Sequence, residues 1–474
     1  MTVASRIRLT YIVTDWLTVA AAFFLFNYIR FVYLQAYLKP ELQIFSWFIT
    51  SPTLLAELIL FPTMAVGLSW LSGFYTEPMF MSRLKAIGDS ALVALIATLV
   101  FFFLAMLNDT LPRRRWNYEL LAILFGLVCV AMSIGRLIIS TYTARLIQKR
   151  LWTVPTLILG ATSAARSFAR RLDSLPKPMG FDICGFVDLG DGQRAPGRRP
   201  VWPLDALSEV IREKKIKSLI IVSDDPDILD TPGLLGTLMA LDLPVRVRPE
   251  IGRRGVAGIP RFTNVSGEAL VDISTPHLSA GMLNVKRVSD LLFASLALVV
   301  LSPVLAAVAL AVKLDSPGPV FYRQRRLGYH RRPFDIIKFR SMRTDAEAAG
   351  PALSSGPGDS RITSVGRFIR KYRLDELPNF WNVVRGDMSI VGPRPEREYF
   401  VSRLIEREPY YALLHSVRPG ITSWGMVKFG YATNVDEMIE RMKYDLLYLE
   451  NMSIGIDIKI LFYTVRTVVT GRGI

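Results

Sequence analysis

The chain has 474 residues, of which 51% are hydrophobic, and its mean hydropathy of +0.31 is high for a soluble protein. Its net charge of +16 suits phosphorylated substrates, anionic lipid or nucleic acid, and the long apolar runs favour the first two over nucleic acid. Two cysteines without a spacing motif and only three histidines argue against a disulfide framework, a zinc site and a histidine-metal enzyme.

The first 150 residues contain four apolar segments, each long enough to cross a bilayer. No small-residue cleavage site follows the first segment, so the sequence predicts a retained helix rather than a signal peptide. Asp15 and Arg136 fall within these segments, where helix-end snorkelling or internal pairing is favoured over a functional role. We predict a four-helix transmembrane bundle over residues 1–150, with spans at 9–31, 52–73, 89–107 and 118–141.

Residues 151–280 alternate between strand-like and helix-like segments, which predicts a parallel, doubly wound, Rossmann-like α/β domain. The first turn begins at Gly160 and lacks the second and third glycines of the dinucleotide fingerprint. Thr162 and Ser163 would hold a phosphate at a helix N-terminus in one interpretation. In the other interpretation, the small residues only let the helix pack on the strand. The predicted strands are 154–160, 181–188, 218–224 and 243–249, and a linker with strand pieces follows at 251–285.

Residues 291–312 form one more apolar segment of membrane-spanning length, with Ser302-Pro303 in its middle. Proline removes a helical hydrogen bond and clashes with the preceding turn, so the helix should bend there. The segment alone fits a kinked spanning helix as well as a helix that enters and leaves by the same leaflet.

Residues 313–373 are strongly basic, with fourteen Lys and Arg against five Asp and Glu. The excess suits anionic headgroups and a diphosphate, although a solvated basic face explains any single residue. Residues 334–340 predict a strand that carries Lys338 and Arg340 on one face. Residues 344–361 are small, polar and rich in proline and glycine, which is typical of a loop that could act as a mobile lid.

The adjacent carboxylates Asp375 and Glu376 lie between an arginine-rich segment and the turn Gly392-Pro393-Arg394-Pro395. A carboxylate can attack phosphorus to form an acyl phosphate, and a second carboxylate can hold Mg²⁺. Arginine forks neutralise and orient phosphate oxygens. The simpler interpretation is a helix start, because Asp and Glu favour the first turn and Leu-Pro follows.

This stretch resembles the bacterial sugar transferases, the monotopic polyprenyl-phosphate hexose-1-phosphate transferases, in their long form. The resemblance covers roughly residues 285–474, and its motifs are specific as a set. The matching residues are Lys338-Phe339-Arg340-Ser341-Met342, Arg370-Lys371, Leu374-Asp375-Glu376-Leu377-Pro378, Asn382, Gly386-Asp387-Met388-Ser389, Val391-Gly392-Pro393-Arg394-Pro395 and Arg418-Pro419-Gly420-Ile421-Thr422.

The resemblance implies an α-rich (α+β) transferase domain over residues 281–474, with a re-entrant membrane helix at 286–313 broken at Ser302-Pro303. It also implies transfer of hexose-1-phosphate from a UDP-sugar to undecaprenyl (polyprenyl) phosphate with release of UMP. This reaction initiates exopolysaccharide, capsule or O-antigen synthesis. The preceding α/β domain looks like the nucleotide-binding-like domain of larger members, for which we favour a regulatory or assembly role.

In this interpretation Asp375 is the nucleophile that carries the phosphosugar, and Glu376 ligates Mg²⁺, with Mn²⁺ as an alternative metal. The phosphate-binding residues would be Lys338, Arg340, Arg370, Arg394 and Arg418. Around the last of these, Ser423, Gly425 and Met426 depart from the family form, so the sequence leaves the donor sugar open.

The implied location is the bacterial inner membrane, with the α/β and catalytic domains in the cytoplasm. The positive-inside rule supports a cytoplasmic N-terminus only weakly, because Arg113-Arg114-Arg115 falls on the outer side. A cytoplasmic nucleotide-sugar decides the orientation. The sequence leaves a homodimer open.

Three later segments have helical spacing of apolar residues and predict amphipathic helices. They are expected at the membrane interface or in the domain core, with equal weight. The segments are 398–417, 438–453 and 458–469.

Two other functions compete with this interpretation. A membrane-bound NAD-dependent enzyme that modifies sugar nucleotides would need a fuller glycine fingerprint and a Tyr-x-x-x-Lys pair, and residues 154–250 contain no tyrosine. A non-catalytic scaffold for polysaccharide assembly would not need an intact Asp-Glu centre.

Overall fold

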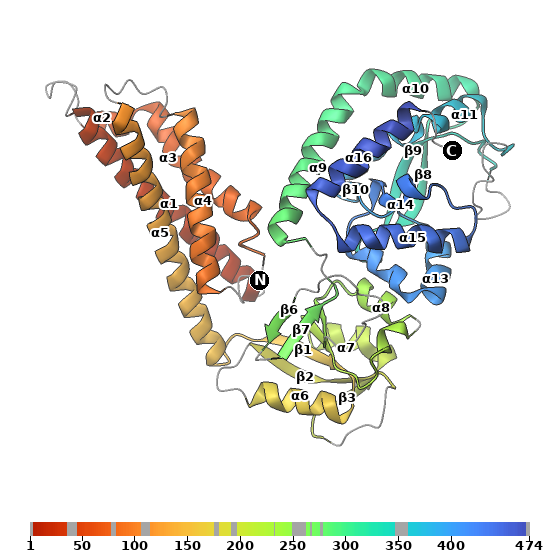
Figure 1. The fold of residues 1–474 in the computed structure, drawn as a ribbon, viewed down its shortest axis with the longest axis horizontal. Helices are drawn as coiled ribbons and strands as arrows, with labels where there is room; N and C mark the ends of the chain where they lie inside the picture. Colours follow the sequence, from red (N-terminus) through yellow and green to blue (C-terminus); the bar gives the residue numbers. More distant parts are fainter. Residues whose placement is uncertain are drawn as a thin grey trace. The chain divides into compact units, whose positions relative to one another are not determined.

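The computed structural model divides the chain into two compact units, each described separately below (Figure 1). The first unit comprises Met1–Trp152 with Ser279–Val285, and the second comprises Thr153–Leu278 with Lys286–Ile474. The structure describes residues 3–35, 45–76, 82–105, 114–174, 180–190, 197–231, 233–248, 262–265, 268–274, 278–346 and 359–470.

Four long helices of the first unit are apolar enough to cross a membrane, as the sequence predicted. Their interior is rich in stacked aromatic rings, and Phe23 contacts both Phe61 and Phe101. Many leucines, isoleucines and valines on the outer faces are exposed, which is expected of helices surrounded by lipid rather than water. The helices are α1 (Val3–Gln35), α3 (Pro52–Leu71), α4 (Arg83–Leu104) and α5 (Arg114–Gln148), with a short α2 (Phe45–Ile49).

Asp15 and Arg136 form a fully buried ion pair inside this bundle. The Arg136 guanidinium lies 2.7 Å from Asp15 Oδ2, and neither side chain is exposed. Ser69 and Ser90 accept further hydrogen bonds from Arg136, and the Tyr75 hydroxyl donates to Asp15. The expectation of internal pairing is therefore confirmed, and helix-end snorkelling is wrong for both residues.

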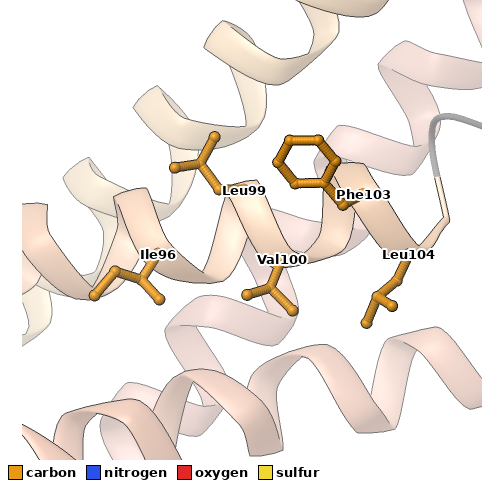
Figure 2. Close-up of a pocket in the computed structure, with 5 residues that line it drawn as sticks. All are labelled: Ile96, Leu99, Val100, Phe103 and Leu104. Carbon is orange, nitrogen blue, oxygen red and sulfur yellow. The ribbon is translucent and has the colours of Figure 1, made fainter.

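An apolar groove runs along one side of α4 (Figure 2). Its lining consists of five side chains from that single helix: Ile96, Leu99, Val100, Phe103 and Leu104. No polar group lines this groove, so it can accommodate hydrocarbon chains but has no side chain that could bind a polar ligand or catalyse a reaction.

The α/β part of the second unit contains a seven-stranded mixed sheet in the order β3-β2-β1-β4-β5-β7-β6. The first five strands in this order are parallel, as predicted, whereas β7 is antiparallel to both β5 and β6. The strands are β1 (Val154–Leu159), β2 (Phe181–Asp188), β3 (Val201–Pro203), β4 (Ser218–Ile221), β5 (Val245–Val247), β6 (Phe262–Val265) and β7 (Glu268–Asp272).

The prediction of a purely parallel sheet is wrong at this edge. The β6–β7 hairpin comes from the segment predicted to be a linker with strand pieces, and it pairs antiparallel with β5, which would otherwise be an open edge. The helices of this part are α6 (Ser163–Asp173), α7 (Leu207–Glu213) and α8 (Leu234–Ala240), with short 3₁₀ turns at Leu204–Ala206 and Ile228–Asp230.

The turn after β1 supports the packing interpretation of its small residues. Gly160 has φ +118°, and a Cβ at this position would collide with the Val222 carbonyl group. The Thr162 hydroxyl is buried, makes no capping hydrogen bond and has no protein partner among the described residues. A phosphate-binding role for Thr162 and Ser163 stays a prediction.

The C-terminal part, residues 286–474, is mostly helical and contains two small sheets. One is the antiparallel hairpin β8–β9 and the other is the parallel pair β10–β11. The strands are β8 (Phe321–Leu327), β9 (Pro333–Phe339), β10 (Ser389–Val391) and β11 (Gly420–Thr422). The helices are α9 (Ala280–Val300), α10 (Ser302–Asp315), α11 (Ser364–Lys371), α12 (Asn379–Arg385), α13 (Glu398–Arg407), α14 (Trp424–Lys428), α15 (Val435–Glu450) and α16 (Ile454–Val469).

The predicted break in the apolar segment is confirmed. Helix α9 ends at Val300, α10 begins at Ser302, and the two axes differ by 62° (Figure 1). Pro303 lies in the first turn of α10, where a missing backbone N–H costs nothing. The Ser302 hydroxyl donates to the Val299 carbonyl, which offsets one hydrogen bond lost at the bend.

The three predicted amphipathic helices have different outcomes. The segment 398–417 is not one helix, because α13 ends at Arg407 and Pro409 starts the 3₁₀ segment Pro409–Ser416. Helices α13 and α15 bury apolar faces in the core. Helix α16 instead leaves a stripe exposed, made up of Ile458, Phe462, Val465 and Val469. The lid predicted at 344–361 lies largely outside the described residues.

Candidate active site

Asp375 and Glu376 occupy a single 3₁₀ turn, Leu374–Glu376, between α11 and α12. Arg373 precedes this turn in the left-handed conformation with φ 54°, which reverses the chain after α11. Pro378 then caps α12. The two carboxylates therefore lie just before a helix start, as the simpler interpretation expected. Their contacts with neighbouring side chains differ from each other.

Glu376 is buried and surrounded by cations. Lys338 Nζ lies 2.6 Å from Glu376 Oε1. Arg394 lies 3.6 Å from the same oxygen, and Arg373 lies 3.5 Å from Glu376 Oε2. Burial opposes ionisation, but the charges of Lys338, Arg394 and Arg373 outweigh it and lower the pKa of Glu376. Glu376 is therefore a fixed anion.

Asp375 has the opposite environment although it is the next residue. Its carboxylate is half-buried, and no hydrogen bond to it is formed by any side chain in the described ranges. Burial and the negative charge of Glu376 raise the pKa of Asp375, against the opposing effect of Lys338, Arg370 and Arg373. A carboxylate that is more basic than usual, with its lone pairs unengaged, is suited to nucleophilic attack.

Asn382 joins the strand that carries Lys338 to the helix that follows the carboxylates. Its side-chain oxygen accepts from Ile337 N at 3.1 Å, and its amide donates to the Asp335 carbonyl at 2.8 Å. These two bonds dock α12 against β9 beside Lys338. Asn382 is completely buried. The hydrogen bonds from the Asn382 side chain to the backbone of β9 therefore help to hold Lys338 close to Glu376.

A second buried carboxylate, Glu396, anchors the arginine turn. It accepts from Arg441 at 2.7 Å and from Arg326 at 2.9 Å. Arg394 Nε lies 3.7 Å from Glu396 Oε1, while the other end of the Arg394 guanidinium faces Glu376. Arg394 is thus held between two carboxylates close to the Asp375-Glu376 pair, and its predicted phosphate-binding role stays a prediction.

The other predicted phosphate-binding residues fall in different places. Arg370 lies close enough to Asp375 to oppose its protonation. Arg418 is exposed and donates to the Gly386 carbonyl at the end of α12. The described contacts do not bring Arg418 to the carboxylate pair, so its predicted role stays a prediction.

Arg340 contradicts the prediction that it shares a phosphate-binding face with Lys338. It is 5% exposed, and its guanidinium donates to the carbonyl groups of Val312, Ser316 and Pro317 at the end of α10. Arg340 lies one residue beyond the end of β9, beside the C-terminus of α10, where carbonyl groups lack helical partners and accept from its guanidinium. These contacts assign Arg340 to the stability of the bent helix pair.

The described protein side chains around Asp375 and Glu376 do not by themselves provide a complete set of metal ligands. In the part of the chain that the structure describes, no group of three or more His, Cys, Asp or Glu side chains could hold a metal ion. Asp375 and Glu376 provide two carboxylates, the usual number for Mg²⁺ when substrate phosphates complete its shell. Oxygen Oε1 of Glu376 is engaged by Lys338, whereas Oε2 has only the long contact to Arg373. The pair fits a metal that enters with a diphosphate.

Three residues around this site were not among the predicted phosphate-binding residues. Glu396 directly follows the matched turn, Arg373 belongs to the arginine-rich segment before the carboxylates, and Tyr431, whose ring lies near Arg373 and Arg394, has no local motif. The position of Glu396 within two residues of Arg394 was an available signal. Tyr431 is far away in sequence, and only the fold brings it to the arginines.

Comparison with known proteins gives consistent results. The sequence profile described as bacterial sugar transferase matches residues 282–471. Over 188 residues the chain is 40% identical to a UDP-glucose:undecaprenyl-phosphate glucose-1-phosphate transferase of Caulobacter vibrioides, covering 39% of this chain and 70% of that protein.

Two further relatives are named for different sugars and are longer than the segment that they share with this chain. A UDP-N-acetylgalactosamine-undecaprenyl-phosphate N-acetylgalactosaminephosphotransferase of Aeromonas hydrophila is 45% identical over 40% of this chain and 44% of its own length. An undecaprenyl-phosphate glucose phosphotransferase of Komagataeibacter xylinus is 34% identical over 76% of this chain and 65% of its own length. The chain thus aligns with less than two thirds of each of these two relatives.

Proposed function

Because the chain belongs to the bacterial sugar transferase family, we propose that it transfers a sugar-1-phosphate from a UDP-sugar to undecaprenyl (polyprenyl) phosphate. The observation that carries this proposal is the pair of adjacent carboxylates with opposite environments. Glu376 is held ionised by Lys338, Arg373 and Arg394, whereas the Asp375 carboxylate is left unengaged. The surroundings of Glu376 keep it ionised, whereas the surroundings of Asp375 leave its carboxylate available for reaction.

In the first step an Asp375 oxygen attacks the β-phosphorus of the UDP-sugar. The bond from this phosphorus to the bridging oxygen breaks, UMP leaves with that oxygen, and the sugar phosphate stays on Asp375 as an acyl phosphate. In the second step an oxygen of the lipid phosphate attacks the same phosphorus, and the Asp375 carboxylate is released. Arg370 and Arg394 lie where cations would hold the phosphate oxygens during both steps.

Glu376 is the residue that would hold Mg²⁺ or Mn²⁺, with Asp375 beside it and diphosphate oxygens as the remaining ligands. The metal, when bound, would neutralise charge on the diphosphate. We expect activity to be lost in EDTA and restored by either ion, and Glu376→Gln to need more metal for half-maximal rate. Full activity in EDTA would exclude this role.

We further propose that the bent pair α9–α10 is re-entrant and that both of its ends return to the same face of the membrane. The beginning of α9 is tied to the C-terminal part, since Lys286 pairs with Asp457 at 2.6 Å and Asp290 accepts from Ser389 at 2.6 Å. The end of α10 is tied to the same part by Arg340 and by buried Val312. A helix pair anchored at both ends to one body supports a hairpin better than a crossing.

The outer surface of this pair has the composition of a lipid-facing surface. Between the two anchored ends, the bend region exposes large apolar side chains, and the stripe on α16 adds to the apolar surface of the C-terminal part. The most exposed residues of the pair are Leu292, Leu296, Val299, Val300, Leu310 and Leu314, each more than 60% exposed.

With this topology, we propose that the α/β part and the catalytic centre lie in the cytoplasm, where a nucleotide-sugar would be found, and that the chain lies in the inner membrane with its N-terminus inside. The α/β part, whose parallel strand order supports a Rossmann-like fold, would serve regulation or assembly. A homodimer remains compatible with this arrangement.

The test is release of UMP by the purified full-length protein. We expect repeated turnover of UDP-glucose or UDP-N-acetylgalactosamine to UMP only when polyprenyl phosphate is present, no more than one UMP per protein molecule without it, and no turnover by Asp375→Asn. Release that depends on NAD⁺, or none with any UDP-sugar in a broad panel, would contradict the proposal.

A further inference from the structure

Tyr431 contacts both arginines that flank Glu376. It lies between α14 and α15, and its ring centroid is 5.1 Å from the Arg373 guanidinium carbon and 5.2 Å from that of Arg394. Each of these arginines reaches a different oxygen of Glu376, at 3.5 and 3.6 Å. The Tyr431 ring is 37% exposed, so it stands at the edge of the site rather than in the core.

Arg373 depends on this ring more than Arg394 does. Arg394 has Glu396 as a second carboxylate partner at 3.7 Å. The Nε group of Arg373 is buried and has no hydrogen-bond partner among the described residues. A guanidinium with an unused donor needs another contact to keep its orientation, and the face of an aromatic ring provides one.

Arg373 also lies close to the other carboxylate. Its charge, with those of Lys338 and Arg370, favours the ionised form of Asp375. If Arg373 rotated away from Glu376, the neighbouring carboxylate of Asp375, whose charge Arg373 already favours, would be an alternative partner. A guanidinium paired directly with Asp375 would occupy the lone pairs needed for attack on phosphorus.

We propose that Tyr431 is a positioning residue that holds Arg373 and Arg394 on Glu376 and so keeps the Asp375 carboxylate free to react. This inference rests on the proposed function, because it concerns the nucleophile of that reaction. It assigns to Tyr431 no contact with substrate and no proton transfer.

The experiment compares Tyr431→Leu, Tyr431→Phe and Phe429→Leu in the full-length protein. Phe429 is a matched control, because it lies two residues away, is 38% exposed and has no cation over its ring in the described part of the chain. We expect Tyr431→Leu to lower kcat roughly tenfold, the size of effect expected from the loss of two partly exposed cation–π contacts. Tyr431→Phe should recover most of the rate because it retains the ring.

A split between kcat and KM, together with rescue by the ring-retaining variant, separates positioning from a merely structural role. In Tyr431→Leu the Arg373 guanidinium loses its aromatic contact and can pair with Asp375, so kcat should fall while the KM for the UDP-sugar changes little. Lys338, Arg370 and Glu376 also face Asp375 and remain in place in all three variants. Phe429→Leu should leave both kcat and KM unchanged.

The outcomes distinguish this inference from the proposed function. If the wild-type protein releases no UMP, the proposed function fails. If the wild type is active and Tyr431→Leu keeps its kcat, the positioning role is wrong. A loss of kcat that Tyr431→Phe does not restore, or equal losses in Tyr431→Leu and Phe429→Leu, would also overturn it.

Discussion

Lys338 Nζ donates to Glu376 Oε1 at 2.6 Å, although the two residues are 38 positions apart in the chain. This contact joins β9 to the 3₁₀ turn that carries the reactive pair. Both side chains are largely buried, at 16% and 6% exposure. The pair therefore sets the position of the turn as well as the charge of Glu376.

Replacing Lys338 by Met should destabilise the protein and stop turnover. Lys338 makes the shortest of the three cation contacts to buried Glu376, and breaking a buried ion pair costs about 3 kcal/mol. The double variant Lys338→Met/Glu376→Gln should regain most of the lost stability without regaining activity. Thermal unfolding in detergent and UMP release measure the two effects. Equal stability of the single and double variants would show that the pair is not coupled.

The rate should fall on the acidic side at a higher pH than an ordinary aspartate would cause. Asp375 must be ionised to attack, and its folded-state pKa is raised above the usual value of roughly 4 by burial and by Glu376. Activity therefore rises as pH increases through this raised pKa. In Glu376→Gln the neighbouring charge is gone, so the acidic limb should move to lower pH. A limb that stays in place in that variant would identify another titrating group.

Asp375 should carry the covalent intermediate. Wild-type protein quenched after mixing with UDP-sugar alone should show a phosphosugar on a peptide that contains Asp375, detected by mass spectrometry. Asp375→Asn should show no such adduct and keep its fold and membrane insertion. An adduct on any other residue would exclude Asp375 as the nucleophile.

The bend at Ser302-Pro303 should decide the side on which the C-terminal part lies. Changing these residues to Ala-Leu restores a continuous apolar helix, which should cross the membrane. A cysteine at exposed position Lys443, in a chain lacking Cys129 and Cys184, then becomes reactive to an impermeant maleimide in intact cells. The same cysteine with the native bend should stay unlabelled, and a cysteine at Thr50 provides the outside control.

Labelling at position 443 with the native bend would contradict both the re-entrant helix and the cytoplasmic active site. No labelling in either protein would show that the bend is not the deciding feature.

A chain that starts at Leu283 should keep some catalysis but lose stability. In the full protein, His330 lies with Nε2 2.9 Å from Asp242 and Nδ1 3.0 Å from the Met239 carbonyl. Arg332 also pairs with Asp242 at 2.6 Å. These contacts bind the β8–β9 turn to the α/β part, and β9 carries Lys338. Asp242→Ala in the full chain should reproduce part of the stability loss. A folded but wholly inactive shortened chain would mean that the α/β part contributes to the site.

The sequence alone determined those features that depend on local chemistry. Apolar runs of sufficient length predicted the four N-terminal helices, and a proline in the fifth run predicted its bend, because both follow from backbone hydrogen bonding in lipid. Alternating strand and helix patterns predicted the parallel strands of the α/β part. The motif set around Asp375-Glu376 indicated the family and the reacting pair.

The tertiary structure alone decided what depends on contacts between distant segments. The β6–β7 hairpin joins the sheet by pairing antiparallel with β5, and the local sequence pattern does not predict this pairing. Arg340 and Lys338 share a strand pattern, yet one binds the end of α10 and the other binds Glu376, because the strand ends between them. Glu376 and Asp375 differ in charge behaviour because Lys338, Arg373 and Arg394 make close contacts with Glu376, whereas burial and the charge of Glu376 raise the pKa of Asp375. The sequence shows which side chains can ionise. The packing of cations from other segments around them determines how far their pKa values shift.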